Sequence, residues 1–460
     1  MTLSNKVFTL AAASLLTIAA YAQAPSSGSR ELMTMAELDS VLSRDISLSS
    51  GNYALYDSRP LLLSRTKKAL DGGTPAPKGY KPVYISTLVR HGARYCIGDG
   101  YHSRLMNFLT EAKDSAQLTA KGEEFLRRYS KIFPLIDGRE GELTQVGYRQ
   151  HQEIAKWLYE SYPEVFKGKT RAKAMSTNVL RTAMSMQAEV SELSSLDPDL
   201  SLEAEASRTL VRLLDPSTGA ALPKPVRVKI SPEGRFTLDS LDKSLGEDKI
   251  SICAEFLKDP LFAHRRFKSG RSGFSSAMRH IIIDAPCMDM KPDFSSFLSD
   301  SQLSAMYKIY VYNGYLNYGL SPQSDKAVAL STYSLLKNFI ACADEDLKDG
   351  TALRLRFGHD TGLMPLLSLM GVNNFGISSS DPSVVIPNWA VYDIPMACNF
   401  VLVFYRPNNG EGDTLVKVML NGKEASLPVE SVSGPYYSWN KLREYYSEVA
   451  DKAEAEFERL

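Results

Sequence analysis

Residues 83–89 form a run of mostly β-branched and apolar residues that ends abruptly in Arg-His-Gly-Ala-Arg at 90–94. This pattern predicts a buried strand that leads into a loop carrying one imidazole and two guanidinium groups. The central glycine permits a tight turn or a close approach to a ligand, and arginine guanidiniums match phosphate oxygens. The loop therefore predicts a histidine placed to attack phosphorus. The alternative is a solvated loop with a chance histidine.

Two further strand-like runs end in polar groups. Residues 171–176 predict a short strand that passes into a helix with Arg181 in its first turn, and residues 353–358 predict a strand that ends in His359 and Asp360. Parallel α/β sheets bring the carboxyl ends of their strands to one edge, and helix N-termini favour anions. We therefore expect the three strand ends to meet at one site.

The combined residue set indicates a chemistry. Three arginines at one edge can surround a phosphate group, two histidines can serve as a nucleophile and as a further donor, and Asp360 supplies a carboxylic acid. Such a set is sufficient for metal-free phosphoryl transfer through a phosphohistidine.

The motifs that carry this chemistry resemble those of a known family. They are Arg-His-Gly-Ala-Arg-Tyr at 90–95, Gly-Glu-Leu-Thr-Gln-Val-Gly-Tyr-Arg-Gln-His at 141–151, Ser176 with Arg181, and the stretch from Gly-His-Asp to Leu-Met-Gly at 358–371. In combination they resemble the histidine phosphatases of the acid-phosphatase branch. Within that branch the sequence is most similar to the multiple inositol polyphosphate phosphatases, which are phytase-like, over about residues 80–430.

The resemblance implies a fold and a set of roles. The fold would be α/β, with a doubly wound, mainly parallel sheet flanked by helices and an inserted, mainly α-helical cap domain. His91 would be the nucleophile, and no metal or cofactor is implied. The residues that would bind the substrate phosphate are Arg90, Arg94, Arg181 and His359.

Two positions depart from the family pattern. Cys96 stands where this branch often has a proline, and His359-Asp360-Thr361 stands where the inositol polyphosphate group has His-Ala-Glu. The shorter aspartate, one position earlier, can place its carboxyl group in a similar spot, as in the wider branch. We therefore assign the proton donor to Asp360, which requires a raised pKa or an acidic working pH.

The chain divides into four predicted parts. Residues 1–22 resemble a secretory signal, with Lys6, an apolar run and the small-x-small site Ala20-Tyr21-Ala22, so the protein is expected to be exported to the periplasm or beyond. Residues 23–79 are expected to pack on the core. Residues 80–194 and 326–460 are expected to form the α/β catalytic core, and residues 195–325 the helical cap insertion.

Charge and composition limit the partners. Lys plus Arg and Asp plus Glu both number 53, which argues against a nucleic-acid or membrane-surface protein with a global basic field. No transmembrane helix is predicted, and the expected partner is a small phosphate ester. Local basic groups at 265–271, at 169–173 and at Lys67 and Lys68 favour a polyphosphorylated substrate such as phytate, although charge runs are often only solvated.

Several alternatives stay open at this stage. The protein could be a broad-specificity acid phosphatase acting on sugar or bisphosphoglycerate phosphates, or a phosphate-ester binding protein without activity. A phosphomutase shares the phosphohistidine, but a signal peptide argues against it. The five scattered cysteines permit one or two disulfides and leave a free thiol.

Smaller features predict structure rather than chemistry. Thr119 and Thr144 each precede a helical pattern as N-caps, and a glycine three residues later suggests close packing of the first helical turn. The tyrosines between 307 and 318 recur at near-helical spacing, which favours a role in the core. The remaining histidines, His102, His151, His264 and His280, are expected to be surface or satisfied core groups.

Overall fold

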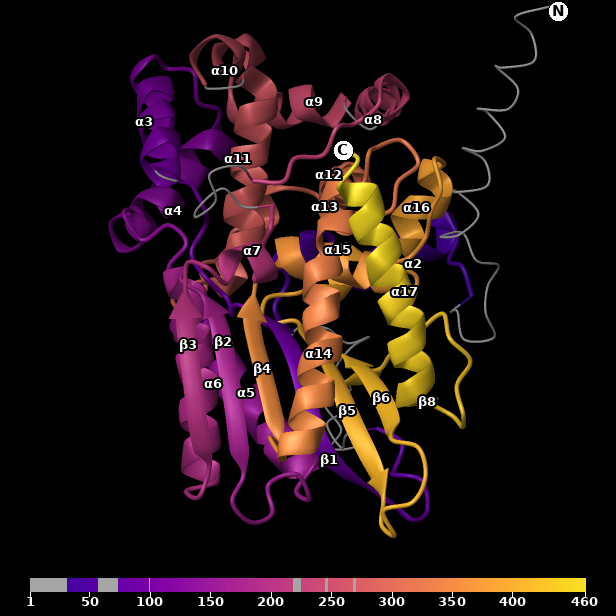
Figure 1. The fold of residues 1–460 in the computed structure, drawn as a ribbon. Helices are drawn as coiled ribbons and strands as arrows, with labels where there is room; N and C mark the ends of the chain where they lie inside the picture. Colours follow the sequence, from indigo (N-terminus) through magenta and orange to yellow (C-terminus); the bar gives the residue numbers. More distant parts are fainter. Residues whose placement is uncertain (1–30, 57–72, 99, 218–224, 245–246, 268–269) are drawn as a thin grey trace, which may run out of the picture.

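The computed structural model describes residues 31–56, 73–98, 100–217, 225–244, 247–267 and 270–460. The predicted export signal, residues 1–22, lies outside these residues. An eight-stranded mixed sheet runs in the order β3-β2-β4-β1-β5-β6-β7, with β8 paired to β6 (Figure 1). The strands are β1 (Tyr80–Arg90), β2 (Arg171–Thr177), β3 (Ser201–Ser207), β4 (Leu353–Gly358), β5 (Asn399–Pro407), β6 (Leu415–Leu420), β7 (Lys423–Glu424) and β8 (Tyr436–Ser438).

The sheet has a parallel half and an antiparallel half. Strands β3, β2, β4 and β1 run parallel, whereas β5 pairs antiparallel with β1 and with β6. In the parallel half Arg90 lies opposite Gly358, and Ser176 lies opposite Phe357. The C-terminal ends of β1, β2 and β4 therefore lie next to one another, at the same end of the parallel strands. The predicted α/β sheet flanked by helices is confirmed, and its parallel character is strongest where the polar strand ends meet.

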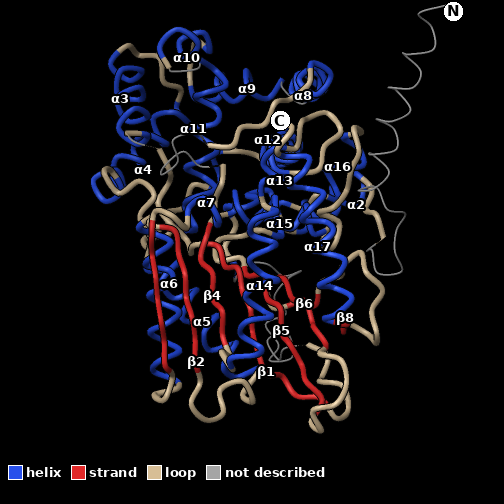
Figure 2. Tube along the Cα trace, viewed as in Figure 1, coloured by secondary structure: helices blue, strands red, loops and turns tan. Residues whose placement is uncertain are grey.

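Helices cover both faces of the sheet, as Figures 1 and 2 show. On one face, Ile85 and Val89 of β1 pack in a core with α5 (Gln145–Ser161) and α6 (Leu180–Leu196). Tyr84 and Leu88 point to the opposite core, which contains α14 (Tyr333–Asp349), α15 (Asp360–Met370) and α17 (Trp439–Phe457). Successive residues of a strand face opposite sides, so the apolar run of β1 is explained by burial on both faces.

A helical body lies beyond the strand ends (Figure 1). Its core of aromatic side chains includes Phe125, Phe256 and Phe274. The helices that build it are α3 (Tyr101–Asp114), α4 (Ala120–Ile136), α9 (Glu247–Phe256), α10 (Pro260–Arg266) and α11 (Gly270–Asp284). Two of them, α3 and α4, come from outside residues 195–325. The division into core and cap stays a prediction.

Strand β3 differs from the sequence expectation. It lies within residues 195–325, which were expected to be helical, and pairs parallel with β2 at the edge of the sheet. Most of its side chains are exposed, so its sequence lacks the apolar run that reveals a buried strand. The chain therefore still contributes to the sheet at Ser201–Ser207, beyond residue 194, where the first core segment was expected to end.

The remaining elements connect these layers. They are α2 (Met35–Arg44), η1 (Ile46–Tyr53), α7 (Val211–Leu214), α8 (Pro232–Ser244), η4 (Ala285–Cys287), η5 (Ser295–Phe297), α12 (Asp300–Tyr318), α13 (Ala327–Ser331), α16 (Pro382–Asn388) and η6 (Val391–Asp393). Helices α13 and α14 adjoin at Thr332. Among the described residues, no helix is long and apolar enough to cross a membrane.

The two predicted capped helices are confirmed. The hydroxyls of Thr119 and Thr144 accept hydrogen bonds from the backbone N–H groups of Gly122 and Gly147. A Cβ atom on Gly147 would overlap the carbonyl oxygen of Ala93, and one on Gly122 would overlap that of Phe256. The glycines therefore let helix α5 approach the loop after β1, and helix α4 approach the end of α9.

These contacts predict the effect of adding one methyl group. Alanine gains about 1 kcal/mol over glycine in a helix interior, but overlap with backbone atoms that cannot move aside costs about 1–3 kcal/mol or more. Gly122→Ala and Gly147→Ala are therefore expected to lower the free energy of unfolding in urea titrations. Glu123→Ala, at an exposed neighbouring position, is the control and should change it by less than about 0.5 kcal/mol. Wild-type stability in both glycine variants would contradict the packing described.

Candidate active site

The loop after β1 is held on all sides by hydrogen bonds. The backbone N–H of His91 donates to the carbonyl of Gly358 at 3.0 Å, which ties the loop to the end of β4. The N–H of Gly92 donates to the Ser185 hydroxyl at 3.0 Å, and the N–H of Ala93 donates to the Gln150 side-chain oxygen at 2.8 Å. The loop is thereby fixed to α5 and α6 as well as to the sheet.

His91 is buried at the centre of this arrangement. Its Nδ1 lies 2.9 Å from the carbonyl oxygen of Gly92. Because a carbonyl only accepts, Nδ1 carries the proton and Nε2 keeps a free lone pair. Burial, and next the charges of Arg181 and Arg90, lower the pKa of His91 well below its ordinary value. The imidazole is therefore neutral at neutral pH, which is the form that can act as a nucleophile.

Three arginines surround His91, as its lowered pKa reflects. Arg90 donates to the carbonyl oxygens of Asn52 and Ile394 and to Asp360. Among the described residues, the buried Nε atoms of Arg90, Arg94 and Arg181 have no hydrogen-bond acceptor. Buried donors are rarely left unpaired, so three guanidinium groups with spare donors suit an anion such as phosphate.

Arg94 and Arg181 have different surroundings. Arg94 donates to the Tyr95 carbonyl at 3.0 Å, lies over the Tyr53 ring at 5.0 Å, and has the carboxylate of Asp284 at 3.7 Å. Within the described part of the chain no carboxylate lies as close to Arg181, and burial, followed by the charge of Arg94, lowers its pKa to about 10. The positive charge near His91 is thus only partly balanced.

His359 forms the far wall of the site, with its ring centroid 5.5 Å from that of His91. Arg181 donates to its Nδ1 at 3.4 Å, so Nε2 carries the proton and lies 3.0 Å from the hydroxyl oxygen of Thr177. Burial, and next the charge of Arg181, lower the pKa of His359 to about 3. The Asp215 carboxylate, 3.8 Å from Nε2, does not reverse this.

Asp360 begins helix α15, directly after His359. Its Oδ2 accepts from Arg90 at 3.0 Å and from the side-chain amide of Asn52. Burial raises the pKa of Asp360, but Arg90 and then Asn52 outweigh it, so the pKa is lowered below its ordinary value. Of the two conditions expected for a proton donor, a raised pKa or an acidic working pH, the first is not met in the protein without ligand, because the neighbouring arginine stabilises the carboxylate.

Two further residues of the site were missed from the sequence. Asn52, in η1, is buried, and its side-chain oxygen accepts a hydrogen bond from the Tyr310 hydroxyl at 2.7 Å. Tyr307 and Tyr315, on the same helix as Tyr310, are fully buried as expected of core residues, whereas Tyr310 reaches Asp360 through Asn52. Only the near-helical spacing of the tyrosines marked Tyr310, and no sequence signal marked Asn52.

Of the basic groups expected at the site, those placed by the described part of the chain on α10 and at the start of β2 lie elsewhere. Arg265 and Arg266 are exposed on α10, far from the strand ends in Figure 1, and pair with Asp259 and Glu111. Arg171 and Lys173 lie at the start of β2, at the N-terminal ends of the parallel strands and so away from the site. They pair with carboxylates that include Asp349. Lys67, Lys68 and Lys268, and the side chain of Arg271, lie outside the described residues.

The remaining histidines were expected to be surface or satisfied core groups. His264 is exposed on α10. His102 is buried with its Nδ1 2.9 Å from the Tyr129 hydroxyl, and His151 is buried with its Nδ1 2.9 Å from Glu189. His264 confirms the expectation of a surface group, whereas His102 and His151 are core groups whose buried Nε2 atoms have no hydrogen-bond partner among the described residues. His280 is partly buried beside Cys96 and Asp284 and is considered below.

Comparisons with known proteins agree with this fold. Residues 84–195 match the sequence profile of the histidine phosphatase superfamily (branch 2). No curated protein matches the sequence significantly. Among solved structures, the chain is similar to a multiple inositol polyphosphate phosphatase from Bifidobacterium longum in complex with inositol hexasulfate, with 16% identity, a TM-score of 0.68, and coverage of 86% of this chain and 97% of that chain. It is also similar to the phytase from D. castellii, with 15% identity, a TM-score of 0.60, and coverage of 88% and 85%.

Fold and family profile together define a hydrolase of phosphoric monoesters. The chain carries a domain of the histidine phosphatase superfamily, branch 2. The TM-scores show that the solved structures share the fold, and at 16% and 15% identity the similarity shows the fold alone.

The lowered pKa of His359 predicts how stability depends on pH. In the unfolded chain this histidine has its ordinary pKa of about 6.5 and binds a proton below that pH. In the folded protein the same proton binds only near pH 3. Stability at this position is therefore complete above pH 6.5 and lost as the pH falls. Between pH 7 and pH 5 the loss is about 2 kcal/mol. His359→Gln should reduce the wild-type loss by that amount in urea titrations at the two pH values, whereas His264→Gln, at an exposed position, should not. An identical loss in wild type and His359→Gln would contradict a neutral buried His359.

Proposed function

We propose that the protein is an exported phosphomonoesterase that hydrolyses inositol polyphosphates through a phosphohistidine on His91. The observation that carries the proposal is the neutral His91, with its Nε2 lone pair free and three arginines around it whose buried Nε donors lack acceptors among the described residues. Export rests on the signal-like sequence of residues 1–22.

In the first step the phosphate group of the ester is bound by Arg90, Arg94 and Arg181, and the Nε2–H of His359 turns from the Thr177 hydroxyl to donate a further hydrogen bond. The Nε2 lone pair of His91 attacks phosphorus, so that a P–N bond forms as the ester P–O bond breaks. Asp360 gives its proton to the leaving alkoxide. The arginines stabilise the charge on the phosphoryl oxygens throughout.

In the second step water attacks the phosphohistidine. Asp360, now a carboxylate, accepts a proton from the water, the P–N bond breaks, and inorganic phosphate leaves with His91 restored. The first step requires the protonated acid, although Arg90 and Asn52 favour the carboxylate in the free protein. Bound phosphate offsets the charge of the arginines and so favours protonation of Asp360. An acidic working pH follows from the same balance.

The substrate class is the finer part of the proposal. Its support is the similarity in fold to a phosphatase whose structure holds inositol hexasulfate. Arg171 and Lys173 no longer support it, because they lie at the start of β2, away from the strand ends of the site, and are paired with carboxylates. Arg265 and Arg266 are excluded for the same reasons. This favours retaining a second candidate, a broad-specificity acid phosphatase.

The nucleophile is tested by removing it. His91→Ala should lower phosphate release by several orders of magnitude, because no other group can form the covalent intermediate. The measurement is release of inorganic phosphate from para-nitrophenyl phosphate, with folding checked by circular dichroism. His264→Ala, on exposed α10, is the control and should keep full activity. Substantial turnover by folded His91→Ala would remove His91 as the nucleophile.

The proton donor is tested by varying the leaving group. Asp360→Asn should slow the hydrolysis of inositol phosphates far more than that of para-nitrophenyl phosphate, since an aryl oxide leaves readily without a proton and an alkoxide does not. The comparison is the ratio of kcat/KM values for the two substrates in variant and wild type. Equal losses on both substrates would show that Asp360 serves binding or folding instead.

The substrate class is tested by direct comparison of esters. Phytate is expected to have a higher kcat/KM than sugar phosphates at acidic pH, with and without a chelator. Equal values across the esters would favour the broad-specificity phosphatase, and transfer to a second acceptor in place of water would favour a mutase. The double variant Arg265→Ala, Arg266→Ala should leave the KM for phytate unchanged, because both residues are paired with carboxylates on the helical body. A raised KM would place α10 in substrate binding after all.

A further inference from the structure

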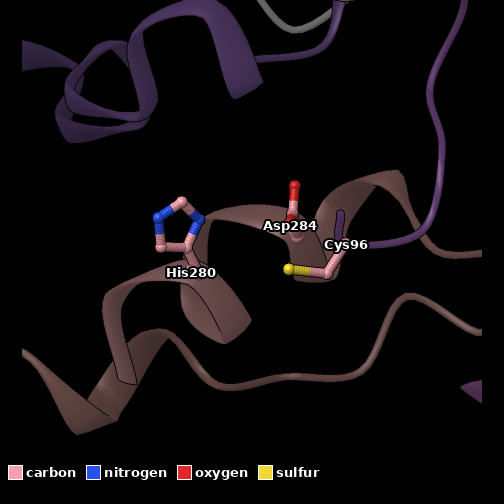
Figure 3. A group of neighbouring side chains, drawn as sticks. All are labelled: Cys96, His280 and Asp284. Carbon is pink, nitrogen blue, oxygen red and sulfur yellow. The ribbon is translucent and has the colours of Figure 1, made fainter. Parts of the chain in front are cut away.

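Three side chains with metal-binding atoms converge between the loop after β1 and helix α11. The sulfur of Cys96, a ring nitrogen of His280 and a carboxylate oxygen of Asp284 all lie within 4.8 Å of one another. Cys96 and Asp284 are buried, and His280 is partly buried. In Figure 3 His280 and Asp284 come from one stretch of ribbon, and the Cys96 sulfur points toward them from a separate segment.

The convergence follows from local structure. His280 and Asp284 are four residues apart on α11, so they lie on the same face of the helix. The loop after β1 brings Cys96 to that face from the opposite direction, two residues beyond Arg94. The Tyr53 ring packs edge-on against His280, with centroids 5.3 Å apart, which limits the orientations of the imidazole.

Asp284 supplies the second observation. Neither oxygen of this fully buried carboxylate accepts a hydrogen bond from a nitrogen or hydroxyl donor among the described residues, and the donor that lies beside it is the Cys96 thiol. Arg94, at 3.7 Å, balances the charge but lies beyond hydrogen-bond distance. A buried carboxylate normally accepts several hydrogen bonds, so its lone pairs are available to a cation.

The disulfide alternative for Cys96 does not apply. All five cysteines lie within the described residues, all five are buried, and none of them forms a disulfide. The one or two disulfides that the sequence permitted are therefore absent from the structure, and the thiol of Cys96 is available as a ligand. The thiolate is the metal-binding form.

The donor types indicate which ion would fit. Sulfur, imidazole nitrogen and carboxylate oxygen together suit Zn²⁺, whereas Mg²⁺ and Ca²⁺ prefer oxygen ligands throughout. Zinc ligands at about 2.0–2.3 Å stand about 3.3–3.8 Å apart in a tetrahedron, so side-chain rotations can bring these three atoms into place. A second acidic group, Glu345, Asp346 and Asp349, is different, because Lys173 lies within 4 Å of each of its carboxylates.

We propose that Cys96, His280 and Asp284 form a binding site for a thiophilic divalent cation, with Zn²⁺ as the best match. Binding forms a metal–sulfur bond and releases the thiol proton to solvent, without any redox change. The site is separate from the proposed hydrolysis, which uses no metal. It nevertheless shares Asp284 with Arg94, and therefore connects cation binding to a residue beside the phosphate-binding loop.

The test uses Cd²⁺ as a spectroscopic probe of the whole protein. Titration should produce an ultraviolet sulfur-to-cadmium charge-transfer band that saturates at one ion per chain. Cys96→Ser should abolish the band, and His280→Gln should weaken Cd²⁺ binding at least about tenfold. Cys342→Ser, which removes a buried cysteine of α14, is the matched control and should leave both band and affinity unchanged.

Two outcomes would overturn the proposal. One is the absence of a saturable band in the wild type, and the other is an undiminished band in Cys96→Ser. The folding of each variant is checked by thermal melting without added metal. If Cys96→Ser does not fold, the Zn²⁺ affinities of His280→Gln and of the wild type are compared by calorimetric titration. Equal affinities would also contradict the proposed site. Phosphatase activity is not the readout, so these outcomes are independent of the proposed hydrolysis.

Discussion

The parallel pairing of β1 with β4 is the constraint on which the site depends. Arg90 lies opposite Gly358, and the first hydrogen bond beyond the ladder joins the N–H of His91 to the carbonyl of Gly358. This register places His91 beside His359 although the two residues are far apart in the sequence. A shift by one residue would turn the side chains of β1 to the opposite faces of the sheet, exposing apolar groups. The packing of both cores therefore also fixes the geometry of the site.

Burial then sets the charge states. Burial and then the nearby arginines lower the pKa of His91 and keep it neutral, whereas at Asp360 burial raises the pKa but Arg90 and then Asn52 outweigh it and hold the group as a carboxylate. The same charges attract a phosphate group, and once it is bound they are balanced. The protonation of Asp360 is therefore coupled to the presence of the substrate. Asn52 joins this balance through the amide that it donates to Asp360, and Tyr310 holds Asn52 in turn.

The sequence predicted the strand ends well because they combine two strong local signals, an apolar run and a polar motif that follows it. The three arginines, two histidines and Asp360 are brought together as expected. Asn52 and Tyr310 could not be predicted in the same way, since their proximity to Asp360 arises from the packing of η1 and α12 against the loop. The described members of the charge clusters at 169–173 and 265–271 were wrongly predicted to lie at the phosphate site, for a related reason. Charge in a sequence does not reveal which edge of the sheet a residue occupies or which carboxylate pairs with it. Strand β3 escaped notice because an exposed edge strand carries little apolar signal.

The central claim is that His91 carries the phosphoryl group during turnover. It is tested most directly by mixing the wild-type protein with radiolabelled phosphate ester, quenching within milliseconds under alkaline conditions that preserve phosphohistidine, and mapping the labelled peptide. The account predicts one acid-labile phosphoryl group per chain, located on His91. The absence of any labelled intermediate during rapid turnover, or a label on another residue, would contradict it.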